Sequence, residues 1–246
     1  MAIIYTQQTG DTRYEIRTAG RSVRLYTNGV LHTQHRPQRH CSGGVWDLLA
    51  LPALALARPP RVLLLGVGGG AAVHLLREWY PGVHITGVDL NQVHLELARR
   101  FFGLQGPDLQ LMHGDARQFV ADYRGAPFDL LIEDLFTDSE GEPARAIEAD
   151  RHWCGQLDRL VSTEGALVIN TLSRRQLQAT ALLAHPALRK RWQSACYLTL
   201  PAYENVVGVL YRKTVSPAGL RAAIRRRPQL ATMEKSGYLS YRVHGL

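Results

Sequence analysis

Hydrophobic positions follow two different patterns along the chain, and the change comes near Arg61. Before it, residues 13–34 alternate apolar and polar positions in short runs separated by turn residues, including an Asn-Gly pair. This pattern predicts an antiparallel β-meander. From Arg61 onward, continuous apolar runs alternate with segments of helical length, which is typical of parallel strands covered on both faces. We therefore expect an N-terminal β-strand module over residues 1–44 and a larger domain over residues 45–246.

The larger domain is predicted to be an α/β fold with a Rossmann-like, doubly wound and mostly parallel sheet, because strands and helices alternate regularly in it. The expected strands are Arg61–Leu65, His84–Val88, Leu109–His113, Leu130–Ile132 and Ala166–Asn170. The expected helices between them are Ala71–Trp79, Gln92–Phe102, Ala116–Tyr123 and Arg151–Leu160. The other expected elements are a buried helix over Trp46–Ala57, a helix over Arg174–Ala184, a hairpin at one sheet edge (Ser194–Leu200 and Val206–Tyr211) and a basic surface helix over Pro217–Arg227.

Composition indicates a folded globular protein. The 246 residues are 46% hydrophobic and 20% charged, near the globular average. The longest apolar run, Leu48 to Ala57, is shorter than the roughly 18 residues of a membrane-spanning helix, and Met1 to Gln8 lacks the pattern of a secretory signal. We expect a soluble, cytoplasmic protein. Its cysteines are then expected to be free thiols rather than disulfides: Cys41, Cys154 and Cys196.

The net charge of +8 favours anionic partners but describes the surface rather than the fold. Basic runs lie at residues 36–40, 189–191 and 225–227. No nucleic-acid recognition motif accompanies them, so a solvated basic face is favoured over a nucleic-acid site. Histidines such as His32 and His35 are not completed by a nearby carboxylate or cysteine into a metal-ligand set. We expect no metal site.

A glycine loop is the strongest chemical signal. An apolar strand runs directly into Gly66-Val-Gly68-Gly69-Gly70, and a helix is expected to begin at Ala71. Glycines permit a tight turn and allow a ligand to approach the backbone. The third glycine of the Gly-x-Gly-x-x-Gly dinucleotide fingerprint would fall at Ala71, so this loop is a different motif.

Acidic residues follow the predicted strands. Asp89 ends the second strand, about 20 residues beyond the glycines, where a carboxylate accepts hydrogen bonds from ribose hydroxyls. Alternatively, Asp89 or Asn91 caps the next helix. Asp115 and Asp134 end two further strands, and ligands bind beyond the carboxyl ends of such strands, so the three acids and the glycines are expected to share one crevice. Asp129 enters its strand at the opposite edge and is predicted to be structural.

These motifs resemble the class I methyltransferase fold and, within it, the spermidine synthase (aminopropyltransferase) group. The resemblance rests on the glycine loop, Val88-Asp89, Gly114-Asp115-Ala116 and residues 128–134. It implies that the loop and the acids hold the thioadenosine part of S-adenosylmethionine, its decarboxylated form or methylthioadenosine. Asp89 resembles the ribose ligand, Asp115 the acid facing the adenine amino group, and Asp134 the catalytic acid that accepts a proton from the attacking amine. The implied cosubstrate-binding residues are Gly66, Gly68, Gly69, Gly70, Asp89, Asp115 and Ala116.

The chain departs from that group where the polyamine should bind. Gly69 stands where spermidine synthases usually carry an acid, and Gly44-Val45-Trp46 replaces their Tyr-His-Glu stretch. Asp134 is followed by residues 135–138, Leu-Phe-Thr-Asp, instead of the usual Ser, Ser or Thr, Asp and Pro. The nucleoside site is therefore expected to be kept and the polyamine site altered.

Two further acidic features lie beside Asp134. Glu133 alternates to the other face of its strand, where it is predicted to be a buried partner for an arginine. Asp138, Glu140 and Glu142 form an acidic loop over the expected crevice. Solvated loop residues are favoured there over a lid that recognises a cationic acceptor.

The resemblance implies a spermidine synthase-like transferase of polyamine biosynthesis. It would bind an adenosyl sulfonium donor and pass an alkyl group, aminopropyl or methyl, to a small amine acceptor, and it suggests a homodimer. One alternative is a methyltransferase acting on a small molecule or on RNA, which a basic surface would assist. A second is a non-catalytic nucleoside-binding or scaffold protein, because this architecture hosts many functions.

Overall fold

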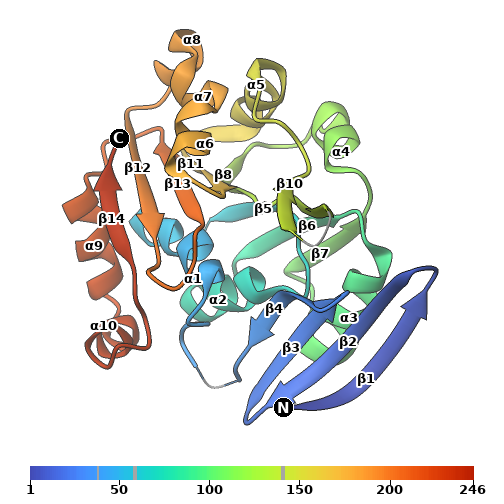
Figure 1. Ribbon diagram of the computed structural model, residues 1–246. Coiled ribbons are helices and arrows are strands. Elements are labelled where there is room, and N and C mark those ends of the chain that lie inside the picture. The colour runs from blue at the N-terminus through green and yellow to red at the C-terminus, as the bar shows by residue number, and fades with distance from the viewer. Residues whose placement is uncertain (38, 58–59, 140–141) are drawn as a thin grey trace.

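A mixed sheet forms the centre of the fold, with the strand order β14-β12-β13-β11-β8-β5-β6-β7 (Figure 1). The computed structural model describes residues 1–37, 39–57, 60–139 and 142–246. The parallel strands are β5 (Arg61–Leu65), β6 (His84–Asp89), β7 (Leu109–His113), β8 (Phe128–Glu133) and β11 (Val161–Thr171). Antiparallel pairing joins β13 (Val206–Tyr211) to β11, β12 (Ser194–Thr199) to β13, and β14 (Arg242–Gly245) to β12. The predicted doubly wound, mostly parallel sheet is confirmed.

Helices cover both faces of this sheet. Along β5, Val62 and Leu64 belong to one apolar cluster, whereas Leu63 and Leu65 belong to the other. Because side chains alternate between faces, a strand buried on both faces reads as a continuous apolar run. The first face packs against α1 (Val45–Ala50), the 3₁₀ helix η1 (Leu51–Ala55), α2 (Ala71–Trp79), α3 (Gln92–Phe102) and α9 (Pro217–Arg225). The second packs against α4 (Ala116–Asp122), α5 (Arg151–Leu160), α6 (Arg174–Ala179), α7 (Ala181–Ala184) and α8 (Pro186–Arg189).

A separate four-stranded antiparallel sheet lies at the N-terminus, drawn in blue in Figure 1. Its strands are β1 (Ala2–Thr9), β2 (Thr12–Ala19), β3 (Ser22–Thr27) and β4 (Val30–His35). The predicted meander is confirmed, but it gains β1, whose largely exposed side chains give no clear alternation. Tyr14, Ile16 and Leu25 join the apolar cluster of the first face of the central sheet. The division at residues 44 and 45 stays a prediction.

Two predicted helices are interrupted. The helix expected over Trp46–Ala57 consists of α1 followed by η1, with Pro52 in the first turn of η1. Proline has no N–H and cannot continue an α-helix from within. The helix expected over Arg174–Ala184 breaks at Thr180, which has an extended ψ of 140° and separates α6 from α7.

The prediction for the C-terminal part of the chain needs two corrections. The hairpin of β12 and β13 is present but does not form the sheet edge, because β14 pairs with β12. The expected basic surface helix over Pro217–Arg227 is α9, which a second helix, α10 (Pro228–Lys235), follows. In α9, Leu220 and Ile224 are fully buried, so its basic residues occupy only the outer side.

The direction of the connections reverses between β5 and β8. The chain runs from β5 to β6 and β7 on one side, and from β8 to β11 on the other. Ligands of doubly wound folds bind beyond the carboxyl ends of the strands at such a switch point. The segments that leave β5 and β8 therefore define the candidate site. No helix in the described part of the chain is long and apolar enough to cross a membrane.

Candidate active site at the switch point

The glycine loop and Asp134 meet directly at the switch point. The backbone N–H of Asp134 donates to the carbonyl of Leu65 at 2.9 Å, so the end of β8 is tied to the end of β5. Gly66 has a φ of +87°, and a Cβ there would lie 2.1 Å from the carbonyl oxygen of Asp134. A larger residue at position 66 would therefore separate the two strand ends.

Asp89 stabilises the glycine loop through backbone hydrogen bonds. One carboxylate oxygen accepts from the N–H groups of Val67 and Gly68, both at 2.8 Å, and the other accepts from Asn91 N–H at 2.8 Å. Asp89 is buried, and burial raises the pKa of its carboxyl group while the three amides oppose that rise. A carboxylate accepts about four hydrogen bonds, so one position remains for a ligand. A ribose hydroxyl can donate to that position while the three amides stay bonded.

Of the two residues considered as the cap of the next helix, Asp89 and Asn91, it is Asn91 that caps it. Its side chain accepts from His94 N–H at 3.1 Å and caps α3. Asp115 caps the next helix, α4, by accepting from Arg117 N–H at 2.6 Å. The N–H of Gly114 donates to the carbonyl of Asp89 at 3.0 Å, so the acids at the ends of β6 and β7 lie at the same edge. The adenine-facing role of Asp115 stays a prediction.

The remaining glycines pack against protein atoms. Gly69 N–H donates to Thr33 Oγ1 at 2.6 Å, and a Cβ at position 69 would lie 2.8 Å from Thr33 Cβ. A Cβ at Gly68 would lie 3.2 Å from the carbonyl of His32, and one at Gly70 would lie 2.0 Å from a methyl of Leu104. The N-terminal sheet therefore closes over the loop. An acid at position 69, as in spermidine synthases, would require Thr33 to move.

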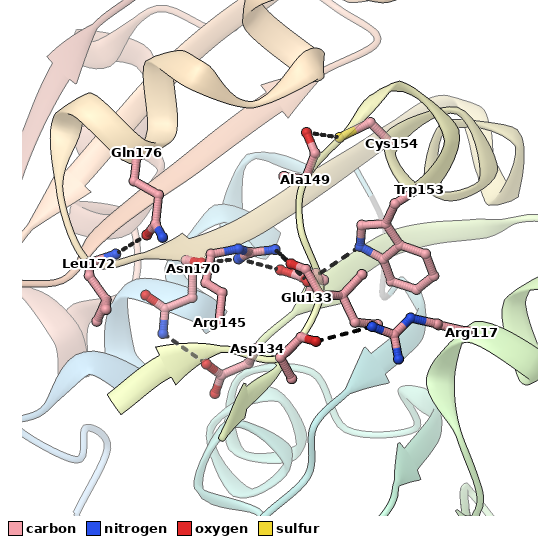
Figure 2. A network of polar contacts seen from close by, with 12 residues as sticks. Arg117, Glu133, Asp134, Arg145, Ala149, Trp153, Cys154, Asn170, Leu172 and Gln176 are labelled. Carbon is pink, nitrogen blue, oxygen red and sulfur yellow. Dashed lines mark hydrogen bonds and ion pairs between the residues drawn. The ribbon is translucent and has the colours of Figure 1, made fainter. Parts of the chain in front are cut away.

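In the described part of the chain, Asp134 accepts one side-chain hydrogen bond. The side-chain N–H₂ of Asn170, near the end of β11, donates to Asp134 Oδ1 at 2.8 Å (Figure 2). Burial raises the pKa of Asp134 to about 6, and the negative charges of Glu133 and Asp89 act in the same direction. Asn170 and Arg145 oppose that rise. A carboxylate with a pKa close to neutrality is suited to accept a proton and release it again.

Glu133 is the buried partner of an arginine, as predicted. Arg145 forms two parallel hydrogen bonds with its carboxylate, at 2.7 and 2.9 Å, and Trp153 Nε1 donates to it at 3.4 Å (Figure 2). The side chain of Glu133 is fully buried and that of Arg145 is 5% exposed. The same guanidinium also donates to the carbonyl oxygen of Asn170. Arg145 therefore connects β8 to the end of β11.

Arg145 is the last residue of a small hairpin that lies beside Glu133 and Asp134. The hairpin consists of β9 (Phe136–Ser139) and β10 (Glu142–Arg145). Of the predicted acidic loop, Glu140 lies outside the described residues, while the backbones of Asp138 and Glu142 belong to β9 and β10. The lid role of this loop stays a prediction.

Asp129 lies away from the crevice, whereas the backbone of His32 packs against the glycine loop. Asp129 accepts from Arg61 N–H at 3.0 Å and from Ser162 Oγ at 3.1 Å, at the opposite end of β8. His32 and His35 do not pair with each other, since their rings lie against His94 and His74, respectively, with centroids 4.8 and 3.8 Å apart. Within the described ranges, no three His, Cys, Asp or Glu side chains form a metal-binding group.

Sequence reasoning missed three contributors to this site: Thr33, Arg145 and Asn170. Asn170 was expected to be the last residue of a parallel strand, and a polar residue at that position is the same signal that identified Asp134. Thr33 and Arg145 carry no comparable signal, because their contacts depend on how the N-terminal sheet and the β9–β10 hairpin fold back onto the central sheet.

Part of the chain is similar in sequence to known transferases. The family model described as a methyltransferase domain matches residues 62–148. The chain is 32% identical to a polyamine aminopropyltransferase of Vibrio vulnificus over 123 residues, 49% of this chain and 40% of that one. It is 40% identical to a trans-aconitate 2-methyltransferase of Streptomyces coelicolor over 89 residues, 35% of this chain and 28% of that one. These alignments cover less than half of either relative.

Solved structures extend the likeness to the whole fold. The crystal structure of a probable spermidine synthase from Corynebacterium glutamicum superposes with a TM-score of 0.76 at 16% identity, covering 100% of this chain and 91% of that one. The chain therefore has the methyltransferase-like α/β fold with a small N-terminal antiparallel sheet. The resemblance to the aminopropyltransferase group that the sequence indicated is confirmed.

Proposed function

We propose that this protein is a spermidine synthase-like transferase that binds an adenosyl sulfonium donor, decarboxylated S-adenosylmethionine or S-adenosylmethionine, and transfers an alkyl group to an amine acceptor. The observation that carries the proposal is the position of Asp134. It is a carboxylate with a pKa of about 6, bonded through its backbone to the strand that leads into the glycine loop. The similarity to a polyamine aminopropyltransferase supports the same assignment.

The proposed reaction is a single displacement. The nitrogen lone pair of the acceptor forms a bond to the alkyl carbon while the carbon–sulfur bond breaks, and the electron pair leaves with the thioether. The protein has to align the two reactants and accept the proton that the amine loses. Asp134 would accept that proton on the oxygen that Asn170 does not bind.

The described residues fit a nucleoside donor. Asp89 retains about one acceptor position for a ribose hydroxyl, and its negative charge also favours a sulfonium cation nearby. Gly66, Gly68, Gly69, Gly70, Asp115 and Ala116 are proposed to complete the cosubstrate site. Leucine and valine side chains buried at the ends of β5 and β6 would exclude water from this side.

Methyl transfer is the second candidate, and the packing at Gly69 favours it. Spermidine synthases usually place an acid there, but in this chain Thr33 leaves no room for one without rearrangement. Without that acid, nothing at position 69 selects an aminopropyl ammonium over the amino acid end of S-adenosylmethionine. The similarity to a methyltransferase points the same way.

A donor panel distinguishes these functions. Thermal shift and calorimetry would compare S-adenosylmethionine, its decarboxylated form and methylthioadenosine, because a ligand that binds the folded state raises its stability. Tighter binding of the decarboxylated donor supports aminopropyl transfer, and tighter binding of S-adenosylmethionine supports methyl transfer. Absence of binding by all three contradicts both and favours a scaffold. An RNA substrate would instead show affinity that falls steeply with salt.

We further propose that the protein is cytoplasmic and, from its resemblance to the spermidine synthase group, that it forms a homodimer. The state of the cysteines supports the first of these proposals. Cys41, Cys154 and Cys196 are free and buried, and burial raises the pKa of each thiol to about 12. Unreactive free thiols suit a reducing compartment. Light scattering on a size-exclusion column would measure the oligomeric state, and a monomeric mass at working concentration would contradict the dimer.

A further inference from the structure

The side-chain amides of Asn205 and Asn170 form consecutive hydrogen bonds that end at Asp134. Asn205 Nδ2 donates to Asn170 Oδ1 at 3.1 Å, and Asn170 Nδ2 donates to Asp134 Oδ1 at 2.8 Å. Asn170 is buried in β11, and its backbone pairs with Val207 of β13. Asn205 immediately precedes β13, at the same end of the sheet. The two amides are therefore placed by adjacent strands.

The hydrogen bonds with Asn205 and Asp134 set the orientation of the Asn170 side-chain amide. An amide presents an acceptor on one side and two donors on the other. With Asn205 donating to its oxygen, Asn170 turns its N–H₂ towards Asp134. The reverse orientation would place the side-chain oxygen of Asn170 against the carboxylate of Asp134, two acceptors, and its N–H₂ against the donor that Asn205 presents in this structure. The backbone carbonyl of Asn170 accepts a separate hydrogen bond from Arg145, which holds the main chain at this point.

We propose that Asn170 and Asn205 are positioning residues for Asp134: Asn170 binds one carboxylate oxygen so that the other faces the acceptor, and Asn205 keeps the amide of Asn170 turned the right way. This inference rests on the proposed role of Asp134 as proton acceptor. Asn205 acts only through Asn170, and neither amide reacts.

A neutral amide suits this position because it does not titrate. The charged groups that act on Asp134 are Glu133 on its own strand, Asp89 at the end of β6 and Arg145 on β10. Arg145 is already bonded to Glu133 at both ends of its guanidinium. The Asn170 N–H is thus the direct donor that keeps Asp134 ionised near neutral pH while leaving it basic enough to accept a proton.

The test measures the pKa of Asp134 without requiring a substrate. Carbon-13 NMR of the side-chain carboxyl groups is recorded against pH, and the resonance missing in Asp134→Asn identifies the group. Asn170→Leu and Asn205→Leu remove each amide at similar volume. Glu204→Gln, an exposed neighbour of Asn205, is the control that changes charge without removing an amide of the series. Thermal unfolding shows that each variant is folded.

Loss of a hydrogen bond to a charged group should raise the pKa of Asp134 by about one pH unit in Asn170→Leu. A smaller rise is expected in Asn205→Leu, and none in Glu204→Gln. The double variant should match Asn170→Leu alone, since a residue acting through another adds nothing once that one is gone. An unchanged pKa in folded Asn170→Leu, or additive shifts in the double variant, would overturn the proposal.

Two further measurements separate this inference from the proposed function. If buried Asn170→Leu does not fold, Asn170→Ser and Asn205→Leu carry the same test. In a transfer assay, the acid limb of kcat/KM should move to higher pH in step with the pKa of Asp134. If the wild-type protein transfers nothing while the NMR shifts occur, the proposed function fails and the positioning of Asp134 by the two amides stands. If transfer occurs and the shifts do not, the amide inference fails alone.

Discussion

Asp89 ends β6 and Asp134 follows β8, at the same edge of the central sheet. Different hydrogen-bond donors offset the burial of these two carboxylates. Asp89 accepts three backbone N–H groups. Asp134 accepts one N–H from a side chain. Burial raises the pKa of both carboxyl groups, and that of Asp134 reaches about 6.

The different hydrogen-bond donors suit Asp89 to ligand binding and Asp134 to proton transfer. Backbone amides belong to the loop itself, so Asp89 and the glycine loop form one rigid unit suited to bind a nucleoside. Asp134 accepts a side-chain amide instead, and its pKa of about 6 lies near the pH at which proton transfer is efficient. The region around Asp134 also depends on other side chains, because Arg145 holds both Glu133 and Asn170.

The largest expected effect comes from removing that arginine. Arg145→Ala leaves the buried carboxylate of Glu133 without a cation, which should lower the free energy of unfolding by about 3–5 kcal/mol. Urea denaturation measures this loss. Arg225→Ala, which breaks the exposed pair with Glu234, is the matched control and should have little effect. Equal losses in the two variants would contradict the dependence of the Asp134 region on its side-chain network.

At the other acid, the expected effect is on binding. Asp89→Ala removes the ribose acceptor and the anchor of the loop amides, so the dissociation constant of the best donor should rise about 10- to 100-fold. Calorimetry measures it. Asp129→Ala, at the opposite end of β8, should leave that constant unchanged. An unchanged constant in Asp89→Ala would assign Asp89 to the fold alone.

The smallest effect is the pH dependence of stability. The carboxyl group of Asp134 has a reference pKa of 3.8 and a folded pKa of about 6. Between these values the folded state binds more protons than the unfolded state, so this group's contribution to stability is lost as pH rises from about 4 to 6. Asp134→Asn does not titrate there. Its stability relative to wild type should therefore increase by about 2 kcal/mol from pH 4 to pH 7.

Unfolding measured at both pH values checks this sign. A stability difference between the two proteins that stays constant with pH would show that burial does not perturb Asp134. The expected gain at neutral pH means that the wild-type protein keeps a destabilising carboxylate, as is common at functional sites.

The parallel sheet and its acids were predictable because each depends on local pattern. Continuous apolar runs define β5, β6, β7, β8 and β11, and a polar residue directly after such a run lies at the carboxyl edge. Right-handed crossovers place the connecting helices on the two faces of the sheet, whereas the strand order was not predicted. Glu133 was correctly expected on the opposite face from Asp134 because side chains alternate along a strand.

Long-range contacts were not predictable in this way. Thr33 packs on Gly69 from a sheet that lies 36 residues earlier in the chain. β14 pairs with β12 although its sequence is short and partly polar. The breaks at Pro52 and Thr180 depend on local backbone conformation rather than on apolar periodicity. Each of these features needs the folded arrangement of distant segments, or a backbone detail that hydrophobic pattern does not encode.

The central claim is that Asp134 accepts the proton in an alkyl transfer whose donor is held by the glycine loop and Asp89. The most direct test measures donor affinity and transfer in wild type and Asp134→Asn, with the donor that binds best and a panel of amines. We predict that transfer falls by about 10²- to 10⁴-fold while the donor's dissociation constant changes less than about threefold, since Asp134 lies outside the proposed nucleoside contacts. Transfer at the wild-type rate by Asp134→Asn would contradict the claim.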